Sequence, residues 1–65
     1  MNKHDFRIEN HGSLYLVRPL TKPATRWLED VTDAQWFGGA AVVEPRYLAP
    51  LVEGMWDAGF ATEAL

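Results

Sequence analysis

The chain has 65 residues, no cysteine and a formal net charge of −3 at pH 7. This length allows one domain at most, and such a domain buries only about 60% of the surface that its unfolded chain exposes. The lack of cysteine excludes disulfides and thiolate metal sites, and no apolar run approaches the roughly 20 residues of a membrane span. The first residues also lack the apolar segment of a signal peptide. We therefore expect one complete, soluble and cytoplasmic domain over residues 1–65.

Charge is distributed unevenly along this chain. Residues 1–26 carry five basic and two acidic groups, a net charge of +3, whereas residues 27–65 carry one basic and seven acidic groups, a net charge of −6. A fold that gathers the second half on one side would present an acidic face. Such a face steers a protein towards a basic surface.

The N-terminal third predicts a β-hairpin. Apolar and polar residues alternate over residues 6–9 and 14–18. The intervening Asn10-His11-Gly12 favours a tight turn, because Asn and Gly both tolerate positive φ. We expect the hairpin to bury four side chains, those of Phe6, Ile8, Leu14 and Leu16.

An amphipathic helix is predicted after the hairpin. Thr21 is a good N-cap, and Pro23 is tolerated in the first turn. The apolar positions that follow have the spacing of one helix face and are Ala24, Trp27, Leu28 and Val31.

Residues 40–43 are all apolar, as is typical of a strand buried on both faces. Gly38-Gly39 before them predicts a bulge or a point of close packing. A second helix is expected from Pro45 to about Ala58, with a kink or an irregular first turn because of Pro50.

The second helix is expected to end in a Schellman closure, with Gly59 in the left-handed conformation and Phe60 packing on Met55. Residues 61–65 either add a short edge strand or fray. The pattern as a whole is β-β-α-β-α with a possible terminal strand. It predicts an α+β domain with a mixed sheet of three to four strands and both helices on one face.

The sequence offers no arrangement typical of catalysis or metal binding. His11 is close to Ser13, but a Ser and a His beside a turn are far more often turn-formers, and no oxyanion-binding motif accompanies them. His4 and His11 lack the spacing of zinc ligands, and the carboxylates do not follow a calcium-loop pattern. Gly38-Gly39 lacks the Lys and Ser or Thr of a phosphate loop. We expect a protein that is not an enzyme and has no cofactor or metal.

Acidic residues and two tryptophans are the candidate binding residues. Three carboxylates cluster near the end of the first predicted helix, where the helix macrodipole favours cations, which indicates some other benefit. The alternative is that they only keep a small protein soluble. Tryptophan is enriched in binding hot spots, with core packing as its alternative role. The candidate partner-binding residues are Glu29, Asp30, Asp33, Glu53, Asp57, Trp36 and Trp56.

Three segments resemble a group of small phage and mobile-element proteins: GSLYLVRPLT (residues 12–21), AQWFGGAAVVE (residues 34–44) and RYL (residues 46–48). The resemblance extends from about Ile8 to Phe60, and within the group the chain resembles type I anti-CRISPR proteins, which inhibit a Cascade surveillance complex. This resemblance implies a non-enzymatic inhibitor in the bacterial cytoplasm, and many such inhibitors are acidic and occlude DNA-binding surfaces. No binding motif carries over residue by residue. The chain departs from a pure DNA mimic at Lys22, Arg26 and Arg46, which are expected to interrupt the acidic face.

The leading hypothesis is a protein-binding inhibitor whose acidic face mimics DNA and blocks the Lys- and Arg-lined DNA channel of a type I CRISPR complex. The alternative is a regulatory or adaptor module of a phage or mobile element that binds another protein, as a homodimer if an apolar strip surrounds Trp56. A third reading, weak nucleic-acid binding by the basic N-terminal half, is disfavoured by an isoelectric point of about 5.1.

Overall fold

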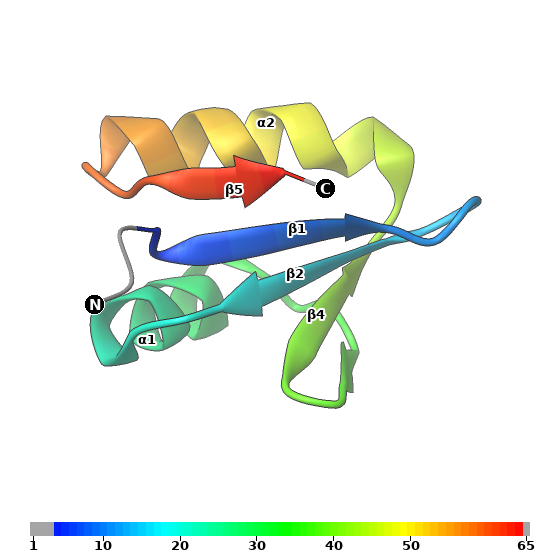
Figure 1. The fold of residues 1–65 in the computed structure, drawn as a ribbon, viewed down its shortest axis with the longest axis horizontal. Coiled ribbons are helices and arrows are strands. Elements are labelled where there is room, and N and C mark those ends of the chain that lie inside the picture. The colour runs from blue at the N-terminus through cyan, green and yellow to red at the C-terminus, as the bar shows by residue number, and fades with distance from the viewer. Residues whose placement is uncertain (1–3, 65) are drawn as a thin grey trace.

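The computed structural model describes residues 4–64, which form two helices and one five-stranded sheet (Figure 1). In chain order the elements are β1 (Phe6–Asn10), β2 (Tyr15–Pro19), α1 (Lys22–Val31), β3 (Trp36–Phe37), β4 (Ala40–Val43), α2 (Pro45–Asp57) and β5 (Thr62–Ala64). The predicted α+β class is confirmed. The sheet has five strands instead of the predicted three to four, because the sequence pattern did not reveal the two-residue β3.

The strands are arranged in the order β3-β4-β2-β1-β5. All neighbouring pairs are antiparallel except β1 and β5, which run parallel. The two outer strands contain only two and three residues, which limits the length of unpaired sheet edge. The predicted terminal strand is β5, and Leu65, which the prediction also included, lies outside the described residues.

The hairpin buries a different side of β2 from the one predicted. Phe6 and Ile8 are buried as expected, but their partners across the hairpin are Pro19 and the fully buried Val17. Leu16 pairs with Glu9 on the opposite face, and Leu14 precedes the strand and is exposed. The reason is the connection, which runs over residues 11–14, so that β2 begins at Tyr15. Because side chains alternate along a strand, a shift of one residue exchanges its faces.

Both helices pack on one face of the sheet, as predicted. The buried cluster joins four strand residues with two from α1 and one from α2; its members are Phe6, Val17, Ala24, Leu28, Ala41, Val43 and Met55. Trp27 packs against this cluster edge-to-face, with its ring centroid 5.9 Å from that of Phe6 and 5.8 Å from that of Phe60. Val31, which was expected to complete the buried stripe, is exposed at the last position of α1.

The β3–β4 connection is a turn and not the bulge that Gly38-Gly39 suggested. Both glycines have positive φ, 56° and 79°, as a two-residue hairpin turn requires. Arg18 donates from Nη1 to the Gly38 carbonyl at 2.6 Å and so crosses β4 on the face without helices. Ala40 follows the Val17–Ala41 pair in the register, is paired with Phe37 of β3, and is fully buried.

Local signals explain where the helices begin and end. The Thr21 hydroxyl caps α1 by accepting from the Ala24 amide at 3.2 Å. The α2 helix runs through Pro50 without a break, and in its first turn the Tyr47 amide donates to the Glu44 carbonyl at 3.0 Å. The predicted Schellman closure is present, with φ of 89° at Gly59 and a 2.9 Å bond from the Phe60 amide to the Met55 carbonyl. Within residues 4–64, neither helix has the length and apolar character needed to cross a membrane.

Candidate functional site

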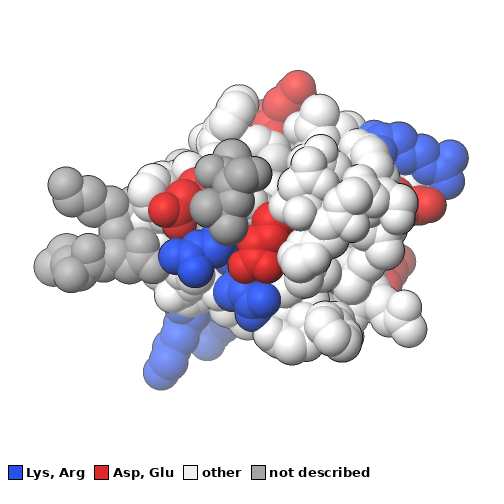
Figure 2. Space-filling view, turned by 45° about the vertical axis from the view of Figure 1, so that its right-hand side comes forward, with Lys and Arg blue, Asp and Glu red and all other residues white. Residues whose placement is uncertain are grey.

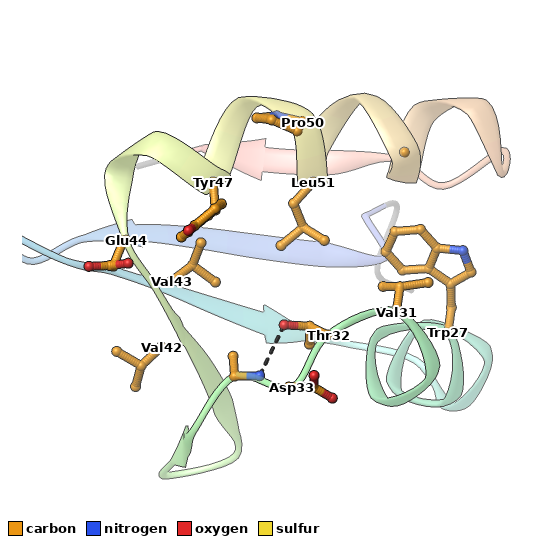
Figure 3. A pocket seen from close by; sticks show the side chains of 12 residues that line it. Trp27, Val31, Thr32, Asp33, Val42, Val43, Glu44, Tyr47, Pro50 and Leu51 are labelled. Carbon is orange, nitrogen blue, oxygen red and sulfur yellow. Dashed lines mark hydrogen bonds between the residues drawn. The ribbon is translucent and has the colours of Figure 1, made fainter.

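A cleft of about 800 Å³ lies between the C-terminal end of α1, the loop that follows it and one side of α2 (Figure 3). Its apolar lining includes Val31, Val43 and Leu51, and the Trp27 ring closes one end (Figure 3). Among residues 4–64, Asp33 and Glu44 supply the only charged side chains that line it, and both are acidic. The cleft therefore combines an apolar floor with a negative rim.

Thr32 determines the course of the chain on the α1 side of the cleft. This residue leaves the helical conformation at φ −133°, while its amide still donates to the Leu28 carbonyl. Its hydroxyl accepts from the Ala34 amide at 3.1 Å, so the chain turns sharply below the end of α1. The turn leaves Asp33 exposed at the cleft, and among residues 4–64 it has no ion-pair partner.

The opposite side of the cleft is at the start of α2 and is formed by Glu44 and Tyr47, with Arg46 next to them. Glu44 occupies the N-cap position, but its side chain makes no capping bond. Its carboxylate accepts instead from Nη2 of Arg46 at 3.4 Å, and the Arg46 guanidinium lies 4.8 Å from the centre of the Tyr47 ring. Tyr47 lines the cleft and Arg46 does not, so this arginine approaches the acidic rim from outside.

A second recess of about 590 Å³ lies along the other side of α2. Of the residues that the structure describes, Glu53 is the only charged one in its lining. Trp56 stands at this recess with 58% of its surface exposed, and its indole Nε1 donates to the Thr62 hydroxyl at 3.1 Å. The bond orients the ring without burying it.

The seven predicted binding residues are thus dispersed. Asp33 lines the cleft, whereas Glu53 and Trp56 line the second recess, and the two recesses share no lining residue because α2 separates them. The other four are exposed elsewhere: Glu29 and Asp30 on α1, Asp57 at the last position of α2, and Trp36 on the edge strand β3. On the face shown in Figure 2, acidic and basic side chains are interspersed.

Sequence reasoning missed Glu44 and Tyr47 as cleft residues. Glu44 directly precedes the second predicted helix and Tyr47 lies in its first turn, but the sequence pattern assigns neither residue to a binding surface. Tyr47 is in fact exposed. The available signal was the position of Glu44 at the junction of a buried strand and a helix, where a side chain projects beyond the end of the sheet.

Charges on the helix-free face of the sheet compensate one another. Arg7 lies beside Glu63 with Nε 3.1 Å from the carboxylate, and Arg18 lies beside Glu9 at 3.4 Å. The pKa of Glu9 is lowered, first by its hydrogen bond with His11 and then by Arg18, against a desolvation effect that raises it. The two arginines therefore do not form an uncompensated basic patch, and Lys3, a third basic residue of this half, lies outside the described residues.

Comparisons with models of known families, with characterised proteins and with solved structures found no match for this chain. What the structure defines is a small α+β domain with an acidic cleft beside its second helix. Among residues 4–64, no group of three His, Cys, Asp or Glu side chains is placed to hold a metal ion.

Proposed function

We propose that this protein is a non-enzymatic inhibitor that binds another protein by docking its helix-bearing side on a basic surface. The observation that carries this proposal is the cleft beside α2, whose floor is apolar and whose charged lining residues, Asp33 and Glu44, are both acidic. An apolar centre with a polar rim is the usual anatomy of a protein interface. Carboxylates at the rim add attraction and orientation towards a basic partner.

The specific partner that we propose is a type I CRISPR surveillance complex, whose target-DNA channel would be occluded. The resemblance of residues 12–21 and 34–44 to small phage proteins supports this choice. Further support comes from Glu29 and Asp30, which are exposed on α1 near Asp33 and extend the negative charge beyond the cleft.

The test is a measurement of target-DNA binding by a panel of reconstituted type I complexes with increasing protein, at several salt concentrations. We expect one complex to lose DNA binding, and the inhibition to weaken with salt, because exposed charges are screened over about 8–10 Å in physiological buffer. Inhibition that is equally strong at low and high salt would contradict the charge-based mechanism. If none of the complexes loses target-DNA binding, the proposed partner is wrong.

Asp33→Asn and Glu63→Gln form a matched pair for this assay. Each removes one negative charge, but Asp33 lines the cleft and Glu63 lies on the helix-free face beside Arg7. We expect only Asp33→Asn to weaken inhibition. Equal effects would show that net charge alone acts, without a preferred side.

A regulatory or adaptor module that pairs as a homodimer is the second candidate, and Trp56 is the observation that favours it. An exposed indole beside an apolar recess is a typical contact for a second chain. A solution mass that rises with concentration, and falls in Trp56→Ser, would support this candidate. A constant monomer mass up to high concentration would remove it.

A further inference from the structure

Arg46 is the cation that contacts Glu44 at the acidic rim of the cleft, and its contacts are weak. Its side chain is 73% exposed. The 3.4 Å separation from Glu44 is long for a charge-assisted hydrogen bond, which is usually about 2.7–2.9 Å. The contact with Tyr47 is the stacking geometry that a guanidinium adopts on an aromatic ring. An arginine held in this way is readily displaced.

The cleft offers an incoming group more than the contacts that Arg46 uses. Asp33, across the cleft, has no ion-pair partner within residues 4–64 and is left for an incoming group. The apolar side chains of Val43, Leu51 and Val31 also line the cleft, and Val31 lies at the end nearer Trp27 (Figure 3). Arg46 reaches the Glu44 side from outside and leaves this floor uncovered.

We propose that the cleft binds a segment of a partner protein in which an arginine lies next to an apolar residue, and that Arg46 competes with that arginine in the free protein. The incoming guanidinium takes over the Glu44 carboxylate and the Tyr47 ring and approaches Asp33, while Arg46 turns to solvent. The neighbouring apolar side chain packs on the floor of the cleft. Arginine fits better than lysine because its planar group both stacks on a ring and pairs with carboxylates.

This inference rests on the proposed function, that the helix-bearing side binds a basic protein surface, and adds the chemistry of the anchoring residue. Charge complementarity supports it, because within the described part of the chain no basic residue lines the cleft and its two charged lining residues are acidic. The size of the cleft also suits a short segment, since a volume of about 800 Å³ is in the usual range of ligand pockets.

The direct probe is an acetylated and amidated pentapeptide, Gly-Leu-Arg-Leu-Gly, titrated into the ¹⁵N-labelled full-length protein. The control peptide carries citrulline in place of arginine, which keeps the shape and removes the charge. The indole N–H signals of Trp27, at the cleft, and Trp56, at the other recess, report the location. We expect the arginine peptide to shift the Trp27 signal with little effect on Trp56, and the citrulline peptide to bind at least about threefold more weakly.

Arg46→Ala and Arg26→Ala separate competition from net charge. Each removes one positive charge, but Arg26 is exposed on α1 and does not line the cleft. We expect Arg46→Ala to bind the arginine peptide about two- to fivefold more tightly than Arg26→Ala does, because an internal competitor has been removed. Asp33→Asn should weaken binding by a similar factor. Alanine is a good helix former, so the start of α2 tolerates the change.

Three results would overturn the inference. They are no shift of the Trp27 signal at millimolar arginine peptide, equal binding of the citrulline peptide, and equal affinities of Arg46→Ala and Arg26→Ala. These outcomes are independent of any CRISPR complex. If a complex is inhibited while the two alanine variants bind the peptide alike, the cleft inference fails and the proposed function stands. If the peptide behaves as expected and no complex is inhibited, only the proposed CRISPR partner fails.

Discussion

Gly54 is a position at which one added methyl group should stabilise the protein. It lies inside α2, where glycine costs about 0.5–1 kcal/mol relative to alanine. A Cβ atom at this position would lie 3.5 Å from two carbons of the Trp27 ring, which is an ordinary van der Waals contact. We therefore expect Gly54→Ala to raise the free energy of unfolding by about 0.5–1 kcal/mol.

Thermal and urea denaturation followed by circular dichroism measure this effect. In a domain of this size 1 kcal/mol corresponds to about 4–8 °C, so Tm should rise by about 2–8 °C, with an unchanged urea m-value. Gly59→Ala is the matched control. No atom of residues 4–64 lies within 4 Å of its added Cβ. Its φ of +89° is unfavourable for alanine, however, so Tm should fall by an amount equivalent to about 1 kcal/mol.

A lower Tm for Gly54→Ala would refute the argument from helix propensity and contact distance. It would mean that Trp27 cannot yield to the methyl group and that the approach of α1 to α2 requires glycine. A higher Tm for Gly59→Ala would instead refute the left-handed conformation at the end of α2.

Three further perturbations test the fold by independent routes. Asp5→Ala removes the acceptor of the Ala61 amide, at 2.9 Å, and should cost about 1–2 kcal/mol in urea unfolding, with a smaller loss contradicting this role. Met55→Ala opens the centre of the core and should cost about 2–4 kcal/mol; a loss below about 1 kcal/mol would mean that the site is not tightly packed. The lowered pKa of Glu9, caused chiefly by His11, stabilises the fold above the usual value of 4.5, and this stabilisation is lost as the pH falls through the lowered pKa. Glu9→Gln should therefore flatten the acid side of the stability profile, and an unchanged profile would contradict the assignment.

The elements that the sequence predicted well are those governed by local chemistry. Thr21 alone marks the start of the first helix. Gly59 and Phe60, two adjacent residues, mark the end of the second helix. The strand β3 could not be predicted in this way, because two residues have no periodicity and their pairing depends on the turn at Gly38-Gly39. The misassigned face of β2 has the same origin, since register depends on the length of a connection that residue types do not determine.

The acidic character of the candidate site could be predicted from the sequence, but its position in the fold could not. The abundance of carboxylates after residue 26 is visible in the sequence, and their exposure follows from their charge. That Asp33 and Glu44 line one cleft follows only from the packing of both helices on one sheet face. The same packing places Glu53 on the far side of α2.

Ion pairs on the helix-free face of the sheet neutralise part of the positive charge of the N-terminal residues. Arg7 and Arg18 belong to the basic half, but they pair with Glu63 and Glu9 on the helix-free face, whose charges cancel. The formal charge of −3 is therefore carried by residues other than these four. Since diffuse charge acts at long range and is screened by salt, whereas the cleft acts on contact, the two contributions are separable. The salt dependence of inhibition measures the first, and the difference between Arg46→Ala and Arg26→Ala measures the second.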